Sequence, residues 1–362
     1  MMIKLHRSNL LENAKKLKCN VIAAFQPENI FYLTGFWGEG IAVCTEDSTS
    51  LIAPKLEVGR ALQESKECEI ISAERGNDLI DSLISKVNKK IICTDCSDQD
   101  IITTIRNGLG TDSLIVNVEP FFSARTIKDE EEIKRIEQAS KVLDKLYSIC
   151  TFEIKVGLSE SELQANLLFE AMKMGAYPAY YKASLNPFII AGGPNGALPH
   201  AQSSDRKFIE GDMIIVDLTL RYKGYIADAT RTFVLGKSNS EMKKVYDIVK
   251  KSQQAGLNAL KPKLVCGEVD AICRNIITEE GYSECFIHST GHGIGLDVHE
   301  PPWIRIKNEE MLKGNMTVTI EPGIYLPGKF GIRIEDSVII SKESSQKARM
   351  LNRFTKDLVE LK

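Results

Sequence analysis

The chain carries a cluster of histidines interleaved with glycines. Three of its five histidines, His288, His292 and His299, fall within the single segment His-Ser-Thr-Gly-His-Gly-Ile-Gly-Leu-Asp-Val-His, and His200 follows Ala-Leu-Pro. Glycine lets the backbone adopt positive φ and pass close to another group. Histidines interleaved with glycines therefore favour a binding or catalytic site. The alternatives are a tight turn that happens to carry histidines, or a weak phosphate-binding loop.

Two aspartates interrupt apolar strands in the middle of the chain. Four apolar residues lead directly into Asp217, and Asp228 follows the turn-like segment 221–224. The two strands would pair as an antiparallel hairpin with both aspartates on one face. Carboxylates that meet there repel each other unless a cation lies between them. A salt bridge, for example from Arg231, is the alternative for each aspartate alone.

Two glutamates repeat this pattern near the carboxyl terminus. Glu321 ends the run Thr-Val-Thr-Ile, and Glu335 follows Gly-Ile-Arg-Ile, two residues after Arg333, which offers a simple salt bridge. One explanation for all four acids is an oxygen-rich metal site completed by one imidazole, a donor set suited to Mn²⁺, Co²⁺, Fe²⁺ or Zn²⁺. Four carboxylates exceed the needs of one ion and fit two ions about 3.5–4 Å apart.

The elements that must position these residues fall into two blocks. The amino-terminal part alternates short apolar runs with helical patterns, which predicts an α/β domain over residues 1–122. In the second part, 123–362, helices and strands are segregated, which predicts an α+β domain around an antiparallel sheet. Expected strands are 21–24, 41–43, 51–53, 91–92, 114–116, 213–220, 225–235, 316–321 and 332–340; expected helices include 79–84, one beginning at 128, 159–174, 240–260 and 268–280.

Composition excludes several function classes. The chain has 362 residues, 46 Lys plus Arg against 49 Asp plus Glu, and net charge −3, so a general nucleic-acid binder is disfavoured. No apolar run reaches the ~18 residues of a membrane span, and the amino terminus reads as an amphipathic helix, so we expect a cytoplasmic protein. The nine cysteines fit reduced thiols. A redox role for the Cys93/Cys96 pair is the weaker alternative.

Five stretches together resemble a known family, the pita-bread metallopeptidases, in the branch of Xaa-Pro dipeptidases (prolidases) and aminopeptidases P. Segments 21–24 and 28–36 resemble the amino-terminal domain of the same branch. The resemblance covers nearly the whole chain and implies a pita-bread catalytic domain, preceded by the smaller α/β domain, and a homodimer. The five stretches are 192–200, 216–232, 288–300, 319–325 and 331–336.

The resemblance also implies a ligand set and a mechanism. Two divalent ions, Mn²⁺ or Co²⁺ first and Fe²⁺ or Zn²⁺ next, would activate a bridging water for attack on the peptide bond of a small peptide substrate. His200 and His299 would orient the substrate and stabilise the tetrahedral intermediate, with His288 nearby. We expect Glu321 also to pass a proton to the leaving proline nitrogen. The implied metal ligands are Asp217, Asp228, His292, Glu321 and Glu335.

The expected substrate contacts leave specificity open. Tyr180, Tyr181 and Phe188 form either an apolar wall for the proline ring or part of the core, and Arg333 is a further expected contact. Relatives that act on dipeptides often place an arginine soon after the His-Glu pair, whereas this chain has a tryptophan there with Arg305 two residues further on. We expect a dipeptidase first and an aminopeptidase P second. A non-catalytic binding protein would have lost ligands, and none is missing here.

Overall fold

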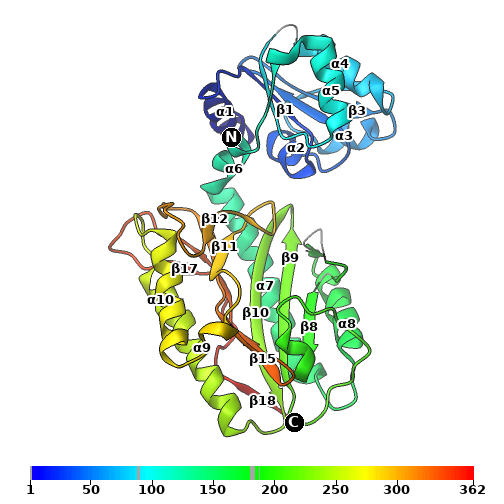
Figure 1. Cartoon of the computed structure of the whole chain (residues 1–362). Helices are drawn as coiled ribbons and strands as arrows, with labels where there is room; N and C mark the ends of the chain where they lie inside the picture. Colours follow the sequence, from blue (N-terminus) through cyan, green and yellow to red (C-terminus); the bar gives the residue numbers. More distant parts are fainter. Residues whose placement is uncertain (1, 88–89, 180–183, 187) are drawn as a thin grey trace. The chain divides into compact units, whose positions relative to one another are not determined.

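The computed structural model describes residues 2–87, 90–179, 184–186 and 188–362. The expected contacts Tyr180 and Tyr181 therefore lie outside the described residues. The chain forms two compact units, Met1–Arg125 and Thr126–Lys362, each with its own core (Figure 1). We describe each unit by itself. Within the described residues, no helix has both the length and the apolar character needed to cross a membrane.

The amino-terminal unit is built on a six-stranded mixed sheet in the order β4-β3-β2-β1-β5-β6. Strands β1, β2 and β3 are antiparallel neighbours, and the outer pairs are parallel. One strand, β4, was not expected, because its sequence Glu-Ile-Ile-Ser-Ala has little of the continuous apolar character of its neighbours. The strands are β1 Val21–Ala24, β2 Ile41–Cys44, β3 Thr49–Pro54, β4 Glu69–Ala73, β5 Ile92–Thr94 and β6 Leu114–Val116.

In the part of this unit that the structure describes, helices α1 to α6 accompany the sheet, and apolar residues of α4 and α5 complete its core. Cys93 and Cys96 lie buried at and after β5. Burial raises the pKa of both thiols, that of Cys93 to about 12, so neither is an activated thiolate. The helices are α1 Met2–Lys15, α2 Pro27–Thr34, α3 Val58–Glu64, α4 Asn77–Val87, α5 Gln99–Leu109 and α6 Glu119–Thr126.

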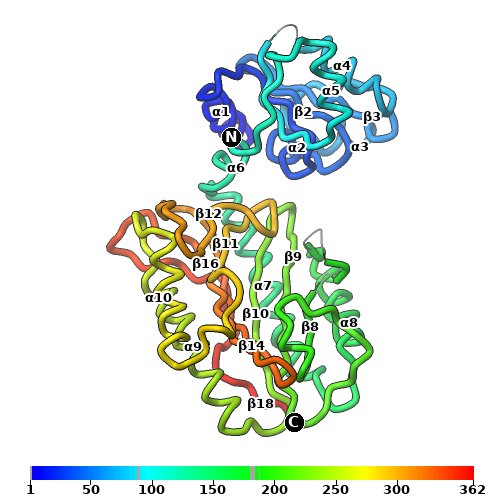
Figure 2. The backbone as a smooth tube through the Cα atoms, in the orientation of Figure 1, coloured from blue at the N-terminus to red at the C-terminus, as the bar shows by residue number. Residues whose placement is uncertain are grey.

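In the described residues, the carboxyl-terminal unit contains two five-stranded sheets and one two-stranded sheet. The first sheet has the order β18-β10-β9-β7, and β8 also pairs with β9. Figure 2 shows the β9–β10 hairpin running the length of this unit, with the last strand of the chain beside it. Its strands are β7 Tyr177–Pro178, β8 Phe188–Gly192, β9 Met213–Tyr222, β10 Tyr225–Leu235 and β18 Val359–Leu361.

The second sheet has the order β12-β11-β13-β16-β17, with the separate hairpin β14–β15. The segment expected as one strand over 332–340 is divided into β15 and β16. It breaks at Ile334–Glu335 because Glu335 pairs with Thr230 of β10 instead. The strands are β11 Gly291–Gly293, β12 Glu300–Ile304, β13 Thr317–Ile320, β14 Gly323–Leu326, β15 Phe330–Arg333, β16 Asp336–Ile339 and β17 Arg349–Met350.

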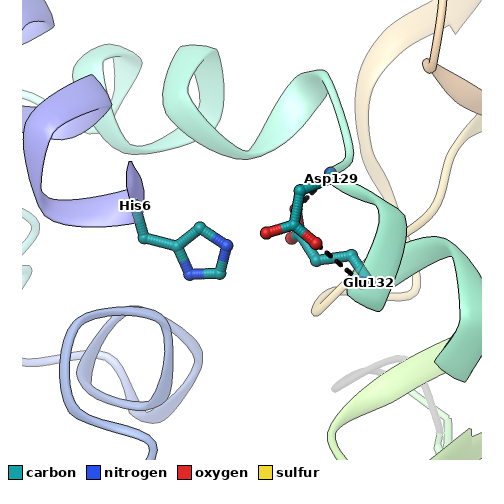
Figure 3. Close-up of side chains that lie close together, drawn as sticks. All are labelled: His6, Asp129 and Glu132. Carbon is teal, nitrogen blue, oxygen red and sulfur yellow. Dashed lines mark hydrogen bonds between the residues drawn. The ribbon is translucent and has the colours of Figure 1, made fainter. Parts of the chain in front are cut away.

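Among the described residues, helices α7 to α10 cover the sheets of this unit. Apolar side chains of α7 and α8 pack on the first sheet, and those of α9 and α10 pack on the second. Both α7 and α8 begin with a capping box, Asp129 with Glu132 (Figure 3) and, as predicted, Ser159 with Glu162. The predicted fold class, α+β with a smaller α/β domain ahead of it, is confirmed. The helices are α7 Glu130–Glu153, α8 Glu160–Lys173, α9 Ser240–Ala259 and α10 Cys266–Glu279.

Candidate metal centre

The β9–β10 hairpin places two aspartates on one face of the first sheet. In its antiparallel register Asp217 lies opposite Thr230, and Asp228 lies opposite Thr219. Residues two apart on a strand share a face, so all four side chains project to the same side. The Thr219 hydroxyl donates to Asp228 Oδ1 at 3.0 Å, which orients that carboxylate.

The second sheet brings His292 and Glu321 to the same place. His292 lies on β11, where its Nδ1 is 3.1 Å from the carbonyl oxygen of Gly293. Donation from Nδ1 leaves the Nε2 lone pair free, and Nε2 lies 3.4 Å from Glu321 Oε1 and 3.9 Å from Asp228 Oδ2. A metal-binding histidine has this arrangement of its two nitrogens.

The glycines beside His292 are required by close packing between strands. A Cβ at Gly291 would lie 2.0 Å from the carbonyl oxygen of Thr319, and one at Gly293 would lie 2.3 Å from that of Pro301. Both separations are far below van der Waals contact with backbone atoms that cannot easily move. The two glycines therefore allow β11 to pack closely against the neighbouring backbone. His292 carries the imidazole of this Gly-His-Gly segment.

Glu335 completes the group and lacks a partner for one oxygen. Its Oε2 accepts a 2.7 Å hydrogen bond from Thr230, whereas Oε1 is buried with no hydrogen-bond partner among the described residues. One ligand atom each from Asp228, His292 and Glu335 can be chosen so that all lie within 4.8 Å of one another. A buried carboxylate oxygen without a partner, on a residue grouped with two other possible ligands, fits a bound cation.

The pKa shifts of the clustered residues also favour a bound cation. Burial, reinforced by the neighbouring acids, raises the pKa of Asp228 and Glu335 well above the ordinary range, and burial raises the pKa of Glu321 to about 8. Burial, followed by nearby His299, lowers the pKa of His292 to about 3, so its imidazole is neutral. A neutral imidazole beside buried acids whose ionised forms need a cation is a donor set that suits a divalent metal ion.

These shifts predict how the chelated protein responds to pH. Glu321 binds its proton more tightly folded (pKa about 8) than unfolded (about 4.3), so stability decreases as pH rises between these values. Glu321 alone should lower the melting temperature of chelated protein by several degrees from pH 6 to pH 8, since about 1 kcal/mol corresponds to roughly 2–4 °C. The lowered pKa of His288 and of His292 acts in the opposite direction, and to the same extent in wild type and in a Glu321 variant, so the contribution of Glu321 is the difference between the two. The Glu321→Gln variant, which cannot titrate, should show a smaller fall; an equal or steeper fall would contradict the assignment.

Arg333 links Asp217 to a tyrosine and a histidine. Its Nη2 donates to Asp217 Oδ2 at 2.5 Å and its Nη1 to the Tyr325 hydroxyl at 2.6 Å. That hydroxyl lies 2.8 Å from Nε2 of His288, whose pKa is lowered to about 3 by burial and then by Arg333, so the hydroxyl donates to it. Arg333 therefore pairs with Asp217, whereas the sequence pointed to Glu335 as its simplest partner.

These groups open into a cavity of about 440 Å³. Beyond the acids and His292, its wall includes His200, His288, His299, Phe188 and Trp303. The rings of His292 and His299 meet edge to face with centroids 4.4 Å apart. Arg305 is exposed and does not line this cavity; its guanidinium lies 6.0 Å from the centroid of the Trp303 ring.

Sequence reasoning assigned no role to three polar side chains that shape this site. Thr219 and Thr230 each donate to a carboxylate of the cluster, and Tyr325 connects Arg333 to His288. The threonines were detectable only through strand register. Each lies two residues from one aspartate on its own strand and opposite the second aspartate on the neighbouring strand. Tyr325 gave no chemical signal of its own in the sequence.

Comparison with known proteins identifies the family to which this chain and its metal centre belong. Residues 134–342 match metallopeptidase family M24, and residues 6–123 match the creatinase/prolidase N-terminal domain. The chain belongs to metallopeptidase family M24. It is 33% identical to an Xaa-Pro dipeptidase of Pyrococcus furiosus over 89% of this chain and 91% of that protein.

Solved structures of similar proteins agree over nearly the full length. A prolidase from Pyrococcus horikoshii OT3 superposes with a TM-score of 0.89 and 32% identity, covering 98% of this chain and 99% of that one. An X-Pro aminopeptidase from Thermotoga maritima gives 0.88 and 31%, with 98% and 99% covered. As an M24 member this chain is a metal-dependent peptidase that uses divalent ions, with the pita-bread fold that the family resemblance implied.

Proposed function

We propose that this M24 peptidase hydrolyses Xaa-Pro dipeptides. The observation that carries the proposal is the buried group of Asp228, His292 and Glu335, with its orphaned oxygen, opening into a cavity of about 440 Å³. That volume lies within the range of about 300–1,000 Å³ usual for small-molecule sites. The similarity to Xaa-Pro dipeptidases supplies the substrate class.

In this proposal Asp217, Asp228, His292, Glu321 and Glu335 hold two divalent ions, Mn²⁺ or Co²⁺ before Fe²⁺ or Zn²⁺. When bound, such ions would activate a water molecule and polarise the scissile carbonyl.

Protein side chains perform the remaining steps. His299 and His200 orient the peptide and donate to the oxyanion that develops. Glu321 carries a proton to the proline nitrogen, which has no N–H of its own before cleavage. Phe188 and His288 line the substrate side of the cavity, where Arg333 is held by its ion pair with Asp217.

The positions of two arginines favour a second candidate, an aminopeptidase P. Arg305, the residue expected to hold the carboxylate of a dipeptide, lies outside the cavity, and Arg333 is already paired with Asp217. The decisive test is to chelate the protein, restore Mn²⁺ or Co²⁺, and compare Leu-Pro with Leu-Pro-Ala. We expect metal-dependent cleavage mainly of Leu-Pro. Cleavage mainly of the tripeptide would make the chain an aminopeptidase P.

The proposal includes the domain division, location and assembly of the chain. A catalytic domain over 123–362 after an α/β domain over 1–122 is supported by family matches to 134–342 and 6–123. A cytoplasmic location is supported by nine cysteines, all described and none in a disulfide. We further propose a homodimer, on the family resemblance, which light scattering of the purified protein tests.

A further inference from the structure

Arg231 on β10 is a buried arginine that touches the main chain of a carboxylate residue in the metal centre. It is 2% exposed, and its guanidinium lies 5.5 Å from the centroid of the Tyr147 ring. Its five N–H donors are all used, and four of the five acceptors are main-chain carbonyls. They are Thr355 O at 3.0 Å from Nε, Thr230 O at 2.9 Å and Glu335 O at 2.6 Å from Nη1, and Phe354 O at 3.0 Å and Asp336 Oδ1 at 2.7 Å from Nη2.

These contacts fix the residue that carries the orphaned oxygen. The Glu335 N–H donates to Thr230 O at 3.1 Å, its carbonyl accepts from Arg231, and its Oε2 accepts from the Thr230 hydroxyl. Only Oε1 is left without a partner among the described residues. The main chain of Glu335 and one of its carboxylate oxygens are thus fixed by β10, which limits where the other oxygen can lie.

Fold stability alone does not explain the buried ion pair between Arg231 and Asp336. Asp336 is fully buried and also accepts from Gln253 Nε2 and lies 2.9 Å from Lys356 Nζ. Burying such charges requires their desolvation, and apolar side chains of similar volume often hold a fold equally well. Apolar substitutes, however, cannot tie β10, Glu335 and residues 354–355 together through four carbonyls.

We propose that Arg231 is a positioning residue for the metal centre: by clamping the main chain of Glu335 to β10 and to residues 354–355, it sets the affinity of the site for divalent metal without touching the ions. This inference rests on the proposed function, because it requires Glu335 to be a metal ligand. It adds a residue that the sequence treated only as a salt-bridge partner for an aspartate.

The test compares Arg231→Lys with a matched control, Lys356→Met. Lysine keeps the charge facing Asp336 but donates from a single atom, so it cannot reach the carbonyls on three segments. The control removes the other cation on Asp336 and leaves the Glu335 contacts intact. We expect Mn²⁺ binding to chelated Arg231→Lys, measured by titration calorimetry, to be about 10–100-fold weaker than wild type. Lys356→Met should bind as wild type does.

Peptidase assays separate positioning from general loosening. In Arg231→Lys the Mn²⁺ concentration for half-maximal activity should rise by the same factor, while kcat at saturating Mn²⁺ stays near wild type. Wild-type affinity in Arg231→Lys, or an equal loss in both variants, would overturn the inference. If Arg231→Lys does not fold, Arg231→Met takes its place; it removes every contact to the four carbonyls and leaves Asp336 paired with Lys356, and wild-type affinity there overturns the inference equally. A wild-type chain that binds neither Mn²⁺ nor Co²⁺ would overturn the proposed function, and this inference with it.

Discussion

Replacing Glu335 with alanine is expected to abolish peptidase activity while leaving the chain folded. The variant removes the orphaned Oε1 and one member of the Asp228–His292–Glu335 group. Loss of even an outer hydrogen-bond partner of a metal ligand costs about 10–100-fold, so loss of a ligand should cost about 10³-fold or more. His292→Ala should behave alike. Metal content by atomic absorption and hydrolysis of Leu-Pro at saturating Mn²⁺ measure both effects.

The fold should survive because the variant removes a buried acid that lies among other buried acids, an arrangement that destabilises the folded chain. Burial and the neighbouring acids raise the pKa of Glu335, so its ionised form is disfavoured in the chelated protein. The variant also loses the hydrogen bond from Thr230, so the chelated variant should unfold cooperatively within a few degrees of chelated wild type. Glu343→Ala, at an exposed position, is the control and should keep full activity. Full activity in Glu335→Ala or His292→Ala would refute that residue as a ligand.

Local patterns predicted the part of the fold that carries the aspartates. The apolar runs on both sides of residues 221–224 predicted the hairpin, and β9 and β10 form it with Asp217 and Asp228 on one face. The prediction succeeded because strand alternation and turn signals are local. The break between β15 and β16 could not be predicted, because Glu335 leaves its own strand to pair with Thr230, about a hundred residues earlier.

Partner choice was the main limit of sequence reasoning at the site. Glu335 lies two residues from Arg333, yet Arg333 pairs with Asp217 on another sheet. Arg231 was considered as a partner for an aspartate of the hairpin, yet it pairs with Asp336. Neighbours in sequence compete with residues that only tertiary packing brings near, and side-chain type alone does not decide between them. Residue type did, however, predict that the acids and a histidine would form one site.

His299→Ala is expected to lower kcat by about 10²–10³-fold, the usual effect of removing one oxyanion donor, with a much smaller change in KM. The ring of His299 lines the cavity and meets the edge of His292. Burial, followed by nearby His200, lowers the pKa of His299, so it is neutral at pH 7 and has one N–H to donate. Steady-state kinetics with Leu-Pro at saturating Mn²⁺ measure kcat and KM separately.

His200→Ala supplies the comparison, because His200 lines the same cavity but is exposed. A hydrogen bond from an exposed donor is weakened by water, so the loss in kcat should be smaller than for His299→Ala. Both variants should bind Mn²⁺ as wild type does, since neither removes a proposed ligand. An unchanged kcat in His299→Ala would assign the oxyanion donor to another group. Loss of Mn²⁺ with kcat would mean instead that His299 acts by holding His292, through their edge-to-face contact, and not by contacting the substrate.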